Sequence, residues 1–205
     1  MNSEKEKKIS LKIKELLSFF QKKKAGYQVY LMPFLNKKAS LLDKKRLRKN
    51  LICQIKSHRN YVEKGYNWGK LLQLRTKPSC PWVGLSISYC DYLGAYVIVF
   101  DKKLSIGFDM EQKKRVTNQV AQRISSNREF DQSPHPALLW VAKEAGVKSL
   151  SAPSSPILFK DCLLSNWRVA CSNQNYFFDF CLRGGHKYKG VAGVVGDLAI
   201  AYTEV

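Results

Sequence analysis

The amino-acid sequence predicts an α+β protein, in which helices and strands occupy separate stretches of the chain. Three observations favour this class: apolar residues at helical spacing, apolar runs typical of strands, and the absence of a repeated strand–helix unit. With 205 residues, of which 45% are hydrophobic and 12% aromatic, the chain can bury a substantial core. We therefore expect a globular protein, built as one domain or as two small, closely packed halves.

The N-terminal part of the chain contains two basic helices separated by a strand. Apolar residues at helical spacing predict an amphipathic helix over 9–24 and a second helix over 41–58, whose buried face includes Leu42. Residues 27–31 alternate as a strand does and end near a proline. The first helix is expected to dock on the domain or to form a solvated extension, and a membrane-surface role is the weaker alternative.

Three strands are expected in the middle of the chain. They cover residues 85–88, 95–100 and 104–110. The short connection at 101–103 predicts a hairpin between the second and the third.

The rest of the chain predicts two helices and then several short strands. The helices cover 116–125 and 136–150, and Pro136 suits the first turn of the second one. A loop at 151–156 follows, and glycines break the spans between the later strands. Those glycines are Gly184, Gly185, Gly190 and Gly193, and the expected strands are 157–159, 167–170, 176–182 and 198–202.

The net charge of the chain is strongly positive. It contains 35 lysines and arginines against 16 acidic residues, a formal charge of +19, which predicts polyanionic partners. Nucleic acid, an anionic membrane, acidic proteins and phosphorylated ligands all fit this charge. Six cysteines without a C-x-x-C pair argue against zinc, and no signal peptide or transmembrane stretch is recognisable. These features predict a cytoplasmic protein with reduced thiols.

Two short motifs carry the candidate chemistry. Asp109 and Glu111 are two residues apart on a predicted strand, so both carboxylates point to one side. Trp140, Glu144 and Lys148 recur every four residues and line one face of a predicted helix. Clustered carboxylates repel one another unless a cation compensates, and Mg²⁺ prefers carboxylate and phosphate oxygens. Either motif alone would equally fit exposed surface residues.

Together, G-x-D-x-E at 107–111 and W-x-x-K-E-x-x-x-K at 140–148 resemble the signature of the 4′-phosphopantetheinyl transferases. These enzymes move the phosphopantetheine arm of coenzyme A onto a serine of a carrier protein and release 3′,5′-ADP. Further likenesses are L-S-I-S-Y-C at 85–90, D-K-K-R at 43–46 and T-K-P at 76–78. The resemblance covers about residues 43–148 and is closest to the monomeric, surfactin-synthetase-activating type.

The resemblance implies two similar α+β halves related by a pseudo-two-fold axis, with the active site between them. The halves would be residues 1–103, with a basic helical extension at 1–25, and residues 104–205, which carry the metal-site motifs. The implied metal ligands, for Mg²⁺ or alternatively Mn²⁺, are Asp109, Glu111 and Glu144. The implied catalytic residues are Glu144 and Lys148, and either Glu144 or a metal-bound water would be the base.

The implied site for coenzyme A comprises Arg46, Lys77, Ser88, Tyr89, Asp109, Lys143 and Lys148. Tyr89 stands where the family has a histidine. A tyrosine can donate one hydrogen bond to a phosphate but supplies no positive charge, so we expect a weaker or displaced grip on the 3′-phosphate.

Two other functions remain open from the sequence. The first is a non-catalytic relative that binds coenzyme A or a carrier protein, and the second is a basic nucleic-acid-binding protein. The leading expectation is an active, monomeric enzyme that acts on an acidic acyl or peptidyl carrier protein. Whether fatty-acid, polyketide or peptide synthesis is served is left open.

Overall fold

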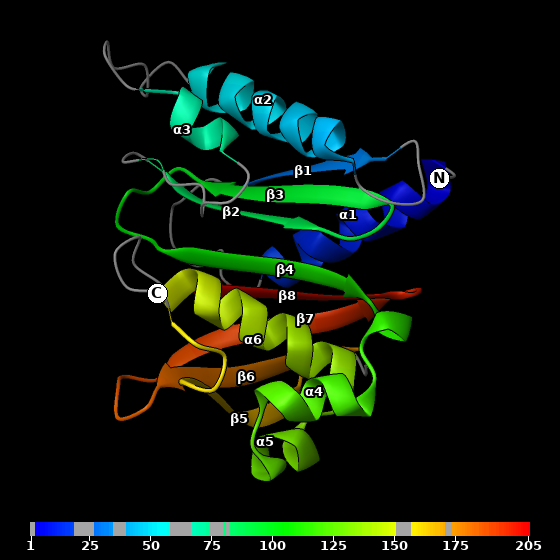
Figure 1. Cartoon of the computed structure of the whole chain (residues 1–205), viewed down its shortest axis with the longest axis vertical. Coiled ribbons are helices and arrows are strands. Elements are labelled where there is room, and N and C mark those ends of the chain that lie inside the picture. Colours follow the sequence, from blue (N-terminus) through cyan, green and yellow to red (C-terminus); the bar gives the residue numbers. More distant parts are fainter. Residues whose placement is uncertain are drawn as a thin grey trace.

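The computed structural model describes residues 3–18, 27–34, 40–57, 67–73, 80, 83–150, 157–170 and 174–205. Two antiparallel sheets follow one another along the long axis of the molecule (Figure 1). The smaller sheet has the order β1 (Tyr27–Pro33), β3 (Leu93–Val99), β2 (Gly84–Tyr89). The larger sheet has the order β4 (Ile106–Gln112), β8 (Leu198–Glu204), β7 (Tyr188–Val195), β6 (Asn175–Leu182), β5 (Cys162–Val169). The α+β class predicted from the sequence is thereby confirmed.

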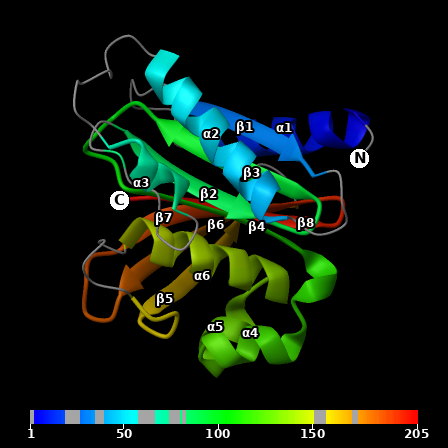
Figure 2. The same cartoon turned by 45° about the horizontal axis from the view of Figure 1, so that its top comes forward.

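Helices cover both faces of these sheets. On one face, α2 (Leu41–Ser57) and the short α3 (Gly69–Leu72) pack on the smaller sheet, and α6 (Pro136–Leu150) packs on the larger one (Figure 2). The opposite face is covered by α1 (Ser3–Ser18). The remaining helical segments are the 3₁₀ turn η2 (Lys113–Arg115), α4 (Asn118–Ile124) and α5 (Asn127–Gln132). None of the described helices is long and apolar enough to cross a membrane.

The N-terminal helix is an integral part of the core. Its apolar side chains Ile9, Ile13 and Leu16 are buried in one cluster with residues of both sheets, among them Val97 and Ile200. This confirms a docked helix, which begins earlier than predicted, while residues 19–24 lie outside the described part of the chain. Since α1 contacts β1 as well as β7 and β8, it holds the two sheets together from behind.

Ile13→Ala is expected to lower the free energy of unfolding by about 2–4 kcal/mol, because it leaves a cavity between α1 and the sheets. Leu11→Ala on the same helix is the matched control, since that side chain is 66% exposed, and it should change stability by less than about 0.5 kcal/mol. Denaturant unfolding of both variants measures the difference. Equal, small effects would mean that α1 contributes little to the core.

Several predictions about the strands were wrong, and the largest error concerned which strands pair with each other. The hairpin expected over 95–110 does not form, because β3 pairs with β1 and β2 while β4 pairs with β8. The connection at 101–103 therefore leads from one sheet to the other. No strand forms at 157–159, and the sequence analysis missed both α5 and β7.

The glycines of β7 serve packing, although the sequence suggested that they interrupt strands. A Cβ atom added to Gly190 would lie 2.2 Å from the Phe178 ring, and one added to Gly193 would lie 2.5 Å from Asn175 Oδ1. Both positions are paired normally with β6. Glycine is therefore required inside this strand by close neighbours and does not end it.

Candidate active site

The two sheets meet where β2 lies beside β4, and serine side chains join them. The backbone N–H of Phe108 donates to Ser86 Oγ at 2.9 Å, and the N–H of Met110 donates to Ser88 Oγ at 3.1 Å. Both serines are buried. Edge strands carry backbone donors that need partners when they are buried, and here hydroxyls supply them. We call this contact between β2 and β4 the serine seam.

Asp109 and Lys148 meet at the serine seam. Asp109 Oδ1 accepts hydrogen bonds from Ser88 Oγ at 2.8 Å and from Lys148 Nζ at 2.7 Å. Lys148, in the last turn of α6, also donates to the carbonyl oxygens of Ile87 at 3.3 Å and Phe108 at 3.1 Å. The structure thus brings together three residues of the predicted site, Ser88, Asp109 and Lys148, which come from three different elements.

Glu111 lies two residues further along β4, on the same face as Asp109. Its Oε1 accepts a hydrogen bond from the backbone N–H of Gln112 at 2.7 Å and lies 3.4 Å from the Arg115 guanidinium. Arg115 also contacts Asp91 at 3.3 Å. Burial raises the pKa of Glu111, and the charge of Asp109 acts in the same direction.

Glu144 on α6 completes the group of carboxylates. Its pKa is raised from the ordinary 4.5 to about 7, chiefly by burial and also by the charges of Asp109 and Glu111, with Lys148 acting in the opposite direction. These four predicted residues are therefore electrostatic neighbours in the folded protein. A carboxyl group with a pKa near 7 can take up and release a proton at physiological pH.

A glycine of the first motif lets α6 lie directly on β4. A Cβ atom added to Gly107 would lie 1.8 Å from the carbonyl oxygen of Ala145, which no larger residue could tolerate. Thr203 Oγ1 on β8 donates to the same carbonyl at 2.9 Å and fixes the helix there. Because Ala145 follows Glu144 directly, this close contact also sets the position of the Glu144 side chain.

The three carboxylates suit a hard divalent cation chemically. Asp109, Glu111 and Glu144 offer the oxygen ligands that Mg²⁺ and Mn²⁺ accept, and their mutual repulsion is what a cation would relieve. As the side chains stand, the described residues contain no group of three His, Cys, Asp or Glu arranged to hold a metal ion. Lys148 Nζ already donates a hydrogen bond to Asp109 Oδ1, and the backbone N–H of Gln112 donates one to Glu111 Oε1. The metal therefore remains a proposal.

Tyr89 follows Ser88 at the end of β2 and is held by two cationic residues of α2. Its hydroxyl accepts a hydrogen bond from Arg48 Nε at 3.3 Å, and Lys44 Nζ lies 5.3 Å from the centre of its ring. Arg46, which the resemblance places at the 3′-phosphate of coenzyme A, is exposed on α2, and its place there stays a prediction. The residues that the sequence analysis missed are Lys44 and Arg48. They are four apart in α2, and this helical spacing could have shown that they share one face.

Arg48 was missed for a second reason, since a basic residue in a basic helix looks solvated. It is in fact buried, and its guanidinium donates to the carbonyl oxygens of Leu71, at 3.0 Å, and of Gln73. Arg48 thereby ties α3 to α2. Lys77, also predicted for the coenzyme A site, lies outside the described residues.

Lys143 requires a correction. The sequence analysis placed it on a coenzyme A phosphate, but its amine is fully buried and forms an ion pair with Glu129 at 2.6 Å. It also donates to the carbonyl oxygens of Phe159 at 3.2 Å and Cys162 at 2.6 Å. With these partners Lys143 joins α6 to α5 and β5, so we leave it out of the proposed site.

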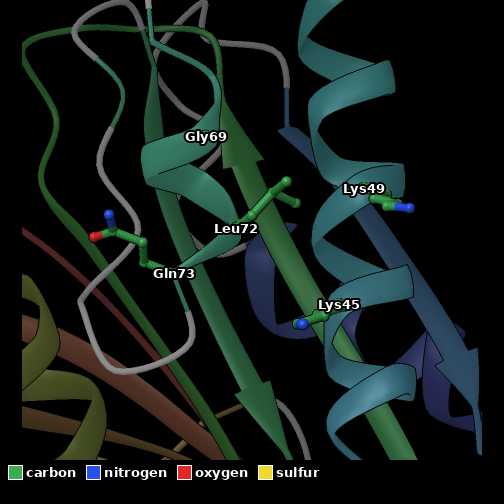
Figure 3. A pocket seen from close by; sticks show the side chains of 5 residues that line it. All are labelled: Lys45, Lys49, Gly69, Leu72 and Gln73. Atoms are coloured by element: carbon green, nitrogen blue, oxygen red, sulfur yellow. The ribbon is translucent and has the colours of Figure 1, made fainter.

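A hollow of about 430 Å³ lies between α2 and α3. It is lined by Lys45, Lys49, Gly69, Leu72 and Gln73, and Leu72 points toward α2 (Figure 3). None of the three carboxylates lines it. The hollow is therefore separate from the serine seam, and we assign it no part in the chemistry.

No protein-family model matches this sequence, and a search of curated proteins finds no matching relative. Function is therefore inferred from the motifs and from the geometry that brings them together.

We expect Glu144→Gln to stabilise the protein at pH 8 and to have little effect at pH 5, without divalent cations. The raised pKa means that the folded state holds this proton more tightly than the unfolded chain, so stability falls as pH rises from 4.5 through about 7. Glutamine imitates the protonated form and avoids that loss, which is on the order of 2 kcal/mol, or roughly 4–8 °C in Tm. Thermal unfolding at both pH values measures it, with Glu4→Gln on exposed α1 surface as the control. An equal gain at both pH values would contradict this account.

Proposed function

We propose that this protein is a 4′-phosphopantetheinyl transferase, which transfers the phosphopantetheine arm of coenzyme A to a serine of an acidic acyl or peptidyl carrier protein. The observation that carries the proposal is the convergence of Asp109, Glu144 and Lys148 at the serine seam, where the two motifs meet. A chance pair of surface motifs would not bring Asp109 and Lys148 into an ion pair at 2.7 Å where β2, β4 and α6 meet. The pseudo-two-fold division into residues 1–103 and 104–205, a monomeric state and a cytoplasmic location belong to the same proposal.

The residues divide the work as follows. The hydroxyl oxygen of the carrier serine forms a bond to the phosphorus that bears the pantetheine arm. The bond from that phosphorus to the bridging pyrophosphate oxygen breaks, and its electron pair leaves with 3′,5′-ADP. Glu144, whose pKa is raised to about 7 when no cation is bound, is the proposed acceptor of the serine proton. Lys148 places its positive charge beside the phosphate oxygen that becomes negative.

A divalent cation fits this division. Asp109, Glu111 and Glu144 would hold Mg²⁺ or Mn²⁺, which when bound neutralises charge on the pyrophosphate. Ser88 holds Asp109 in place through its hydroxyl. Tyr89 and Lys44, which lies over its ring, would face the phosphates of coenzyme A, while the buried Arg48 holds the Tyr89 hydroxyl in place.

The test is mass spectrometry of apo carrier proteins incubated with this protein, coenzyme A and Mg²⁺. We expect the mass of one phosphopantetheine arm to be added, and we expect the gain to vanish with Asp109→Ala or with a chelator. Asp101→Ala, which removes an acid in the turn between the sheets, should leave the transfer unchanged.

Failure would take two distinguishable forms. Coenzyme A binding without transfer to any of several carriers would favour a non-catalytic relative. If the protein neither binds coenzyme A nor transfers the arm, the proposal is overturned. Polyanionic partners such as nucleic acid would then be the next to test.

A further inference from the structure

Two adjacent leucines at the start of α2 point into solvent. Leu41 is 70% exposed and Leu42 is 66% exposed, although the sequence predicted Leu42 in the buried face. The helix does not need them for its N-terminus, because Ser40 and Asp43 cap it: the Asp43 N–H donates to Ser40 Oγ, and the Ser40 N–H donates to Asp43 Oδ2, both at 3.1 Å. Among the large hydrophobic side chains that are strongly exposed in the described residues, these two alone are neighbours in sequence.

Cationic side chains continue the same stripe of the helix. Leu41, Lys45 and Lys49 are spaced four apart, so they lie along one side of α2, and both lysines are exposed. These two lysines also line the hollow between α2 and α3, where Leu72 adds an apolar wall (Figure 3). We call Leu41, Leu42, Lys45, Lys49 and this hollow the α2 patch.

The α2 patch lies at the edge of the candidate active site. Lys44, in the same turn as the leucines, lies over the ring of Tyr89, and Tyr89 adjoins Ser88, which holds Asp109. Both α2 and α6, which carries Glu144 and Lys148, cover the same face of the molecule (Figure 2). A macromolecule bound on the α2 patch would therefore lie beside Lys44 and Tyr89, at the edge of the serine seam.

We infer that the α2 patch is the docking surface for an acidic amphipathic helix of the carrier protein. This inference rests on the proposed function. Exposed leucines with lysines at helical spacing complement a helix that presents apolar and acidic side chains, and the hollow gives such a helix a place to lie. A second copy of this chain is a poor occupant, because the copies each carry a formal charge of +19 and would bring lysines against lysines.

The test uses two variants of the full chain and two matched controls. Leu41→Ser with Leu42→Ser removes the apolar part, and Lys45→Glu with Lys49→Glu reverses the charge. Leu158→Ser removes a leucine that is equally exposed, at 70%, ahead of β5, and Lys187→Glu with Lys189→Glu reverses two exposed charges near the start of β7. Steady-state transfer then gives kcat and the KM values for apo carrier and for coenzyme A.

We expect both patch variants to raise the carrier KM at least tenfold while the KM for coenzyme A changes less than twofold. Both controls should leave the carrier KM within about twofold of the original. An unchanged carrier KM in the patch variants overturns the inference even though transfer itself continues. Thermal unfolding of each variant separates this effect from a loss of folding.

Titration calorimetry with an apo carrier protein tests the surface without transfer. The original protein could bind the carrier without transferring the arm, while the patch variants lose this binding. That result would support the inference and contradict the proposed function. Absence of any carrier binding would overturn the inference. Two further results would overturn it if the carrier KM does not depend on Leu41 and Leu42. One is self-association, measured by sedimentation, that depends on these leucines, and the other is binding to phosphatidylglycerol vesicles that depends on them.

Discussion

Glu129→Ala is expected to lower the free energy of unfolding by about 3–5 kcal/mol at pH 7, because it leaves the amine of Lys143 charged and buried without its partner. The two groups lie 2.6 Å apart, and both side chains are almost completely buried. The Glu129 carboxylate also accepts the backbone N–H groups of Ser126, at 2.9 Å, and Leu164, at 2.8 Å. One substitution therefore removes the glutamate half of the α5 capping box and the links of α5 to α6 and β5.

The pH dependence of this effect has a defined sign. Burial alone would raise the pKa of Glu129, but the hydrogen bonds from Lys143, Ser126 and Leu164 outweigh it, so the pKa is lowered. A lowered pKa stabilises the fold above the ordinary value of 4.5, and that stabilisation is lost as pH falls through the folded pKa. The difference between the original protein and Glu129→Ala should therefore narrow in acid.

Denaturant unfolding measures the loss, and Asp131→Ala, two residues further along α5 and exposed, is the control. Replacing both partners, with Glu129→Gln and Lys143→Met, should recover part of the lost stability because no uncompensated charge remains. A loss below about 1 kcal/mol for Glu129→Ala would show that the pair contributes little.

If the proposed function holds, Lys148→Met is expected to reduce kcat/KM for transfer by about 10²–10³, because it would remove the cation assigned to the departing phosphate. Lys148 Nζ lies 2.7 Å from Asp109 Oδ1 and bonds carbonyls of both β2 and β4, so its position is fixed before any ligand arrives. Steady-state kinetics with apo carrier protein measures the change. Lys102→Met, in the exposed turn between the sheets, removes the same charge elsewhere and should have no effect.

A structural role alone for Lys148 would give a different result. Lys148→Met would then lower Tm while the rate constant of the remaining folded protein stayed the same. Lys148→Arg discriminates further, because it keeps a cation at the serine seam and should retain part of the activity.

Local patterns in the sequence identified most of the elements but not their partners. The helix predicted over 136–150 has those bounds in the structure, since its apolar spacing and its first proline are properties of the segment itself. The hairpin over 95–110 failed because the strand at its end pairs with β8, at the other end of the chain. Pairing over such distances leaves no mark in a short window of sequence.

The same distinction holds within the candidate site. Spacing alone predicted that Asp109 and Glu111 share a face and that Glu144 and Lys148 share another. Spacing could not show that Lys143, next to Glu144, turns inward to a glutamate fourteen residues earlier. Such a contact depends on how α5 packs against α6, which the sequence does not display.

The docked N-terminal helix has a consequence for how the protein is made. Ile9, Ile13 and Leu16 are synthesised before β7 and β8, yet they are buried against both strands. A nascent chain on the ribosome therefore carries α1 with its apolar side uncovered until the C-terminal strands emerge. Contacts of such sequence separation slow folding. Completion of the core cluster that contains Ile9, Ile13 and Leu16 therefore has to wait for β7 and β8.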